Sequence, residues 1–331
     1  MERLRWILPL VTTFLPLVGA KVHALHGAVA GVVALSALAV VDALCWLAGG
    51  TKYSVQTGRP VPAGPFYGVL FTIYCVLLPF SFFEFVRGCA AMGPADLAGH
   101  VFSWVVILGF STLTVGHVLI HASSKLSRAA GQGLFSLMNY PHFPMLHVHE
   151  HHRHVAMEGD FHSAARNETF YAFFARAFMA EVACPWRPKH RRRSLAPAAA
   201  QLVLLVGIWT LAGPRALDIY VLTTFLARVV IALINYVQHY GLRRHAGQKP
   251  GIEHSWDLPH KSMSWLYFNA GFHADHHLKA SLAPDQVALK GNGYLLPFNV
   301  QIIIPLALLP WLFFRAMNPL LASAEAQSEP A

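Results

Sequence analysis

Histidines occur in this sequence at spacings that would let them bind metal. The densest run reads HxxxHH from His147, and shorter HxxxH and HxxHH runs begin at His117 and His273. On a helix, residues three or four positions apart lie on one face, so each run would present at least two imidazoles to one point. His239 stands alone in the sequence NYVQHYG. The nine candidate ligands are His117, His121, His147, His151, His152, His239, His273, His276 and His277.

The number and type of these ligands favour two metal ions and redox chemistry. One ion takes about four to six ligands, so nine imidazoles exceed what one ion needs. Imidazole ligation without thiolates suits iron, copper or zinc rather than magnesium or calcium, and iron is the usual choice for oxygen activation. A structural zinc would usually recruit cysteine, and the four cysteines form no CxxC pair. A histidine-rich surface loop without metal remains an alternative at this point.

The composition places these histidines in a membrane protein. The chain has 331 residues, of which 55% are hydrophobic and 12% are charged, whereas soluble domains carry about 25% charged residues. The net charge of +9 is better explained by basic residues facing anionic lipids than by nucleic-acid binding. We therefore expect no nucleic-acid partner and a lipid membrane around the chain.

Six apolar segments predict membrane-spanning helices, at residues 6–20, 27–48, 64–85, 97–121, 197–213 and 219–240. With the N-terminus inside, the outer loops hold three basic residues and the inner segments hold 21. That asymmetry predicts that both termini are cytoplasmic. The histidine-rich segments 122–196 and 241–291 then lie on the cytoplasmic side, and an all-α integral membrane protein is expected.

The apolar run near the C-terminus differs in sequence pattern from these spans. Prolines interrupt the apolar run at 295–317, so we expect an interfacial or re-entrant helix there rather than a seventh span. Residues 321–331 are expected to form a polar tail. The prediction is thus one membrane-embedded domain over residues 1–320, followed by that tail.

The motifs around the histidines resemble those of the integral-membrane di-iron alkane hydroxylase and xylene monooxygenase family, which is related to the fatty acid desaturases. The three boxes occur in that family's order, with NYVQHYG matching its NYxxHYG. The sequences YPHF at 140–143 and HSWD at 254–257 resemble its YGHF and HSWN. The resemblance covers roughly residues 100–320.

The resemblance implies an alkane 1-monooxygenase-like enzyme of the inner or plasma membrane, with its metal site on the cytoplasmic side. It implies that a di-iron centre uses dioxygen to hydroxylate a terminal or benzylic C–H bond of an alkane, alkyl-aromatic, terpene or acyl chain. The nine histidines would hold the two irons, Asp160, Asp275 and Asn235 would support them, and no further catalytic residue is expected.

Electrons are expected from a rubredoxin- or ferredoxin-type carrier and its NAD(P)H reductase. The sequence shows no flavin fold, no cysteine quartet and no haem motif of its own. The basic run at 186–193 is expected to contact lipid, or alternatively to dock an acidic carrier.

Other readings remain open at the sequence level. A desaturase shares the histidine boxes, and a non-enzymatic metal transporter or sensor could also cluster histidines at a membrane. Val118 and Gln238 stand where the family has glutamate, so an inactive relative is a further alternative. Arg228 lies in an apolar span and therefore requires a partner, for which we expect Asp42.

Overall fold

The computed structural model describes residues 66–328, apart from residues 259, 261–263, 265, 292 and 297–299. Within these residues the fold is helical except for one pair of short parallel strands, β1 (Trp256–Asp257) and β2 (Tyr294–Leu295). The expected all-α class is therefore confirmed for the part of the chain that the structure describes.

Within the described residues, four helical stretches are long and apolar enough to cross a membrane: Gly68–Ala91, Pro94–His121, Arg191–Ala212 and Pro214–Gln238. They overlap the predicted spans at 64–85, 97–121, 197–213 and 219–240. The predicted spans at 6–20 and 27–48, and Asp42 within the second of these, lie outside the described residues.

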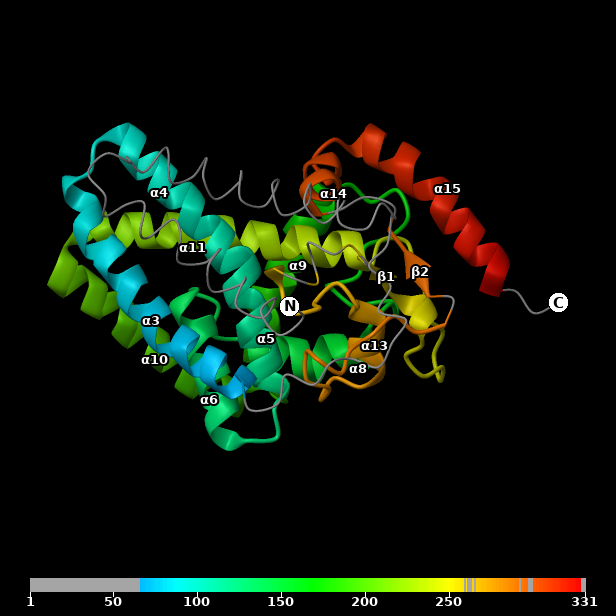
Figure 1. The fold of residues 1–331 in the computed structure, drawn as a ribbon, viewed down its shortest axis with the longest axis horizontal. Coiled ribbons are helices and arrows are strands. Elements are labelled where there is room, and N and C mark those ends of the chain that lie inside the picture. Colours follow the sequence, from blue (N-terminus) through cyan, green and yellow to red (C-terminus); the bar gives the residue numbers. More distant parts are fainter. Residues whose placement is uncertain are drawn as a thin grey trace.

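The spanning helices lie together at one end of the molecule (Figure 1). The first span is α3 (Phe66–Gly88) with its continuation η2 (Cys89–Ala91). The second is one continuous helix made of α4 (Pro94–Val106), η3 (Ile107–Thr112) and α5 (Leu113–His121). The other two are α10 (Arg191–Ala212) and α11 (Pro214–Gln238). The segment η3 is π-helical, so this span contains one wide turn. Helix α11 packs along α4 and η3.

The remaining elements lie beside the ends of these spans (Figure 1). They are α6 (Lys125–Leu137), α7 (Phe143–Leu146), η4 (His147–His151), α8 (His152–His154), α9 (Phe170–Ala183), η5 (Cys184–Trp186), η6 (Ile252–His254) and α13 (His273–Leu278). The side chains of Ser124 and Thr169 accept hydrogen bonds from the first turns of α6 and α9 and so fix where these helices begin.

The C-terminal region differs in part from the sequence expectation. Helices α14 (Val300–Ala307) and α15 (Pro310–Ser328) are separated by Leu308 and Leu309, so the apolar run at 295–317 is not one continuous helix. Residues 321–328, expected as a polar tail, continue α15. Leu321 and Ala324 are buried in the apolar cluster that also contains Tyr236 and Phe313, which explains why this segment is ordered as a helix.

Candidate metal centre

Ring nitrogens of nine histidines converge in two groups, within each of which the atoms lie no more than 4.8 Å apart. The first group is His117, His121, His147, His152 and His276, and the second is His151, His239, His273 and His277. These are the nine histidines that the sequence singled out. Among the described residues, no other histidine joins either group.

A π-helical turn decides how the central histidine box is divided. On a regular α-helix, His147 and His151 would share a face. The segment η4 is instead π-helical, and residues five apart then align. His147 Nε2 consequently lies 2.8 Å from His152 Nε2, while His151 belongs to the second group.

Helix α13 lies between the two groups and contributes to both. Its i and i+4 residues, His273 and His277, have Nε2 atoms 3.0 Å apart in the second group. The ring of His276 lies in the first group, with Nε2 3.0 Å from that of His152. His239 follows the end of α11, and its Nε2 is 3.0 Å from His273 Nε2.

The nitrogen atoms of both groups fit a bound cation better than they fit a hydrogen-bond network. Metal–nitrogen bonds of about 2.1 Å at right angles separate neighbouring ligand atoms by about 3 Å, which is close to the 2.6–3.0 Å seen between paired Nε2 atoms. The buried Nε2 atoms of His121 and His151 have no hydrogen-bond partner among the residues that the structure describes. Burial lowers the pKa of His239 to about 3 and that of His152 further, so these rings are neutral, as ligands must be.

Hydrogen bonds at the opposite ring nitrogen orient two members of the second group. His151 Nδ1 donates to the buried carboxylate of Asp160 at 3.0 Å, and the Ser163 hydroxyl donates to the same carboxylate at 2.6 Å. Burial alone would raise the pKa of Asp160, but the His151 ring and these hydrogen bonds hold it below its usual value. His239 Nδ1 donates to the carbonyl of His254 at 3.2 Å. Both rings are thus fixed with Nε2 facing the cluster.

The other two expected supporting residues have different contacts. The Asp275 carboxylate accepts from the Ala288 amide at 3.0 Å and faces Lys290 Nζ at 3.6 Å, so its described contacts are with the following loop and not with a ring nitrogen. Asn235 is buried and lines a small cavity beside His117. The contacts of Asp275 give no support to the expectation that it orients a histidine ring.

Asp257 was not anticipated from the sequence. Its buried Oδ1 accepts from the Ala274 amide at 2.8 Å, at the start of α13. The backbone of Asp257 also pairs with Leu295 through the strand pair. Burial raises the pKa of this carboxyl to about 7. The residue therefore anchors the helix that supplies three histidines, and its place in the HSWD motif was the available signal.

Glu150 was also missed, although it lies inside the central box. Its buried carboxylate accepts from His190 Nε2 and from Lys189 Nζ, both at 2.7 Å. These bonds attach the middle of the basic run at 186–193 to the segment that carries His151. Lys189 thus has a carboxylate partner in the protein, whereas the run as a whole was expected to face lipid or an acidic carrier.

Among the described residues, Arg228 pairs with Glu181, whereas the expected partner Asp42 lies outside them. The Nη2 atom of Arg228 donates to Glu181 at 2.7 Å, and its guanidinium lies 4.1 Å from the centre of the Tyr140 ring. The other oxygen of Glu181 accepts from His162 Nε2 at 2.9 Å. This buried network satisfies the charge that the apolar span would otherwise expose to lipid.

Two small cavities adjoin the first group of histidines. One, of about 50 Å³, is lined by His117, His147 and His273 together with apolar side chains and Gln238. The other, of about 40 Å³, is lined by His117, His276 and Val118. Val118 and Gln238, which stand where the family has glutamate, therefore line these two cavities. Each replacement makes the wall of its cavity less acidic.

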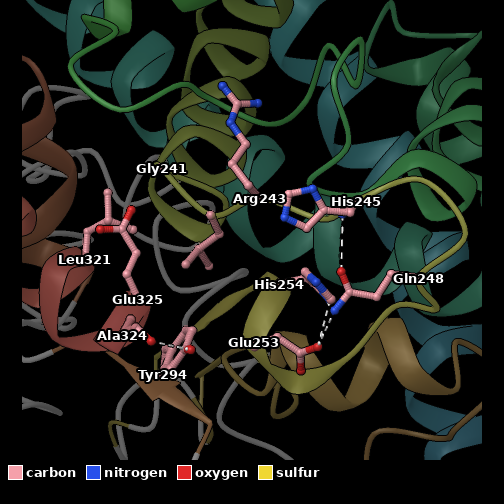
Figure 2. A pocket seen from close by; sticks show the side chains of 11 residues that line it. Gly241, Arg243, His245, Gln248, Glu253, His254, Tyr294, Leu321, Ala324 and Glu325 are labelled. Atoms are coloured by element: carbon pink, nitrogen blue, oxygen red, sulfur yellow. Dashed lines mark hydrogen bonds and ion pairs between the residues drawn. The ribbon is translucent and has the colours of Figure 1, made fainter. Parts of the chain in front are cut away.

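A larger polar hollow of about 490 Å³ is lined by residues of the segment that follows His239 and by residues of β2 and α15 (Figure 2). His254, whose carbonyl accepts from His239, lines it together with Arg243. Gln248 connects its rim, accepting from the His245 amide at 3.2 Å and donating to Glu253 at 3.3 Å (Figure 2). Polar molecules in this hollow can therefore reach His254, which hydrogen-bonds His239 of the second group.

Comparisons with known proteins agree with this geometry. The fatty acid desaturase family model matches residues 94–288, which is more than half of the chain. The chain is 28% identical over 286 residues to alkane 1-monooxygenase 1 of Pseudomonas aeruginosa, covering 80% of this chain and 75% of that protein. It is 26% identical to alkane 1-monooxygenase 2 of Alcanivorax borkumensis, covering 67% of each. It is 25% identical to the xylene/toluene monooxygenase hydroxylase component XylM of Pseudomonas putida, covering 64% of this chain and 63% of that protein.

Proposed function

Because this chain belongs to the fatty acid desaturase family, we propose that it is a membrane-bound di-iron monooxygenase acting on a lipophilic substrate. The reaction is hydroxylation of a terminal or benzylic C–H bond with dioxygen. The observation that carries the proposal is the pair of histidine groups beside a cavity at the ends of two spanning helices. The similarity to alkane and xylene monooxygenases supports hydroxylation over other reactions of the family.

In this proposal the five histidines of the first group and the four of the second each hold one iron. Bound iron would supply the activation of dioxygen and the transfer of one oxygen atom to carbon. Asp160 keeps the proton of His151 on Nδ1 and thereby leaves Nε2 free as a ligand. The carbonyl of His254 has the same effect on His239.

The cavity beside the first group is suited to an apolar reacting carbon. Phe110, Leu113, Phe143 and Ile234 line it and would exclude water from the reacting end of the substrate. Asn235, Gln238 and Tyr267 are the polar residues other than histidine and threonine that line it. None of them is a carboxylate, so no carboxylate acid or base is assigned in this cavity.

Electrons are proposed to come from a rubredoxin- or ferredoxin-type carrier with its NAD(P)H reductase. The four cysteines are scattered along the sequence and do not form an iron–sulfur motif. The basic residues of segments 122–196 and 241–291 support a cytoplasmic metal site, where such a carrier would reach it.

Metal analysis and Mössbauer spectroscopy of the purified protein test the metal part of the proposal. We expect two irons per chain, and one zinc per chain would contradict it. The matched variants are His151→Ala, which removes a proposed ligand, and His149→Ala, which removes a histidine of the same run that belongs to neither group. Only the first should lower the iron content.

Product mass with isotope-labelled dioxygen tests the reaction. Hydroxylation adds one labelled oxygen atom, whereas desaturation, the alternative that the family match favours, removes two hydrogens and adds none. A lipophilic product that carries no label would contradict the monooxygenase assignment.

A further inference from the structure

A third group of potential metal ligands lies outside the two histidine groups. The carboxylate of Glu150, the thiol of Cys184 and the imidazole of His190 each place one donor atom within 4.8 Å of the others. All three residues are buried. None of them belongs to the nine histidines of the metal centre, and the proposed hydroxylation gives them no role.

Three separate elements bring these donors together. Glu150 lies in η4, Cys184 begins η5, and His190 immediately precedes α10. Backbone hydrogen bonds run from the Arg187 amide to the Cys184 carbonyl at 3.1 Å and from the His190 amide to the Arg187 carbonyl at 2.9 Å. These successive turns return His190 to the neighbourhood of Cys184, so the donors are in place before any ion binds.

The thiol of Cys184 differs from another buried thiol in its hydrogen bonding. The equally buried Cys89 donates from its sulfur to the Val86 carbonyl at 3.0 Å. Among the residues that the structure describes, the Cys184 sulfur makes no hydrogen bond, and the buried Nδ1 of His190 has no partner there either. The thiol is therefore free to become a ligand, and Nδ1 is free to carry the imidazole proton.

A cation already lies beside this group. Lys189 Nζ is 2.7 Å from Glu150 Oε1, the atom that also accepts from His190 Nε2 at 2.7 Å. The lysine side chain is 56% exposed, so its ammonium can leave for water at little cost in free energy. The arginines of the run at 186–193 are exposed as well, and water screens their repulsion of a further cation.

We propose that Glu150, Cys184 and His190 bind a zinc ion, which replaces the ammonium of Lys189. Thiolate, imidazole and carboxylate are the three ligand types that zinc takes in proteins, whereas calcium and magnesium take oxygen ligands. On binding, the thiol releases its proton to water, and His190 moves its proton from Nε2 to Nδ1 and binds through Nε2. The carboxylate and the thiolate together neutralise the divalent ion, and water takes the fourth tetrahedral position.

A zinc ion at this position would attach the central histidine box to the start of α10. Glu150 lies in η4, the π-helical segment that also contains His147 and His151. Those two histidines belong to different groups, so the ion would hold the segment that is shared between them. The inference does not rest on the proposed function, because none of its three ligands belongs to either histidine group.

Cobalt(II) absorption of the full, iron-loaded chain under anaerobic conditions is the first test. Cobalt takes the place of zinc and shows a thiolate-to-metal charge-transfer band only where a cysteine binds it. Burial and the Glu150 carboxylate raise the pKa of the Cys184 thiol, so the free thiol is neutral and the band reports bound metal.

We expect this band in the wild type and in the control variant Cys89→Ser, with its full height at one cobalt per chain. It should be absent in Cys184→Ser. A wild type without the band, a band that survives in Cys184→Ser, or a band that disappears in Cys89→Ser would each overturn the proposal.

The exchange with Lys189 is tested through the dissociation constant of cobalt. Lys189→Ala removes the competing ammonium and should tighten binding by up to about fivefold, the range of a partly exposed ion pair. The matched control is Arg192→Ala, because Arg192 is exposed in the same run and is not the basic partner of Glu150. Equal dissociation constants for the two variants would contradict the exchange.

X-ray absorption at the zinc edge requires no variant and decides the matter if Cys184→Ser does not fold. The iron-loaded wild type with one equivalent of zinc should show one sulfur neighbour at about 2.3 Å, and a zinc shell without sulfur overturns the proposal. Zinc that replaced iron among the nine histidines would show no sulfur neighbour. Sulfur-bound zinc in a chain that binds no iron would support this site and contradict the di-iron assignment.

Discussion

Asp160 and Asp275 both neighbour histidine boxes, but only Asp160 accepts from a ring nitrogen. Asp160→Asn removes a negative charge that lies 3.0 Å from His151 Nδ1 and also accepts from the Ser163 hydroxyl. Asp275→Asn makes the same chemical change one residue from His276, where the carboxylate accepts from a loop amide. The two variants therefore separate ring orientation from the general loss of a nearby charge.

The expected size of the effect follows from burial and geometry. Losing a partner that orients a metal-bound histidine costs roughly 10–100-fold in affinity, which is about 1.4–2.7 kcal/mol. The side chains of His151 and Asp160 are both fully shielded from solvent, so water cannot replace the lost interaction and the effect should lie near the upper end of that range. Asp275→Asn should change the affinity less than about threefold, since it alters no described contact to a ring.

Competition between the protein and a chelator of known affinity measures this difference. Iron bound per chain is recorded as the chelator concentration rises, for the wild type and for each variant. Equal losses for both variants, or no loss for Asp160→Asn, would refute the assignment of Asp160 as the residue that orients His151. Thermal unfolding of the metal-free proteins controls for damage to the fold.

Three further predictions concern the fold around the centre. Glu181→Gln and Arg228→Gln should each lower the free energy of unfolding by roughly 3–5 kcal/mol, because each leaves a buried charge unpaired. In a double mutant cycle, the double variant should lose less stability than the sum of the two single losses. Simple additivity of the losses would contradict the ion pair. Burial raises the pKa of Asp257 from 3.8 to about 7. The stabilisation from its protonated carboxyl is therefore complete below pH 4 and is lost as the pH rises through 7, by up to roughly 4 kcal/mol. Asp257→Asn should flatten the pH dependence of the free energy of unfolding between pH 5 and pH 8. Gly241 has φ of +75°, a backbone conformation that strains other residues, and its Cβ position meets Leu321. Gly241→Ala should therefore lower the free energy of unfolding by about 1–3 kcal/mol in thermal unfolding. Adding Leu321→Ala should not restore the loss, because the backbone strain remains.

The clustering of the nine histidines could be predicted from the sequence because residue type and spacing carry that information directly. All nine histidines selected by spacing lie in the two groups. Their division between the groups could not be predicted, because it depends on the π-helical turn at His147–His151. Such a turn comes from one residue more than a regular helix would hold, and no residue type marks it.

Partners from distant segments were the least predictable feature. Arg228 requires a carboxylate in its span, but the sequence does not say which one. The structure brings Glu181 to it from α9. Asp275 illustrates the converse, since its place between two histidines suggested a role at a ring nitrogen, whereas its carboxylate accepts from the Ala288 amide.

The sharing of α13 and the central box between the two histidine groups has a consequence for assembly. Each of these segments contributes histidines to both groups, so under the proposed function ordering one segment around a first ion would also position ligands for a second. The entropic cost of ordering would then be borne largely by the first binding step. Loading of the two proposed positions would be cooperative, and chains with a single ion should be scarce compared with empty and fully loaded chains.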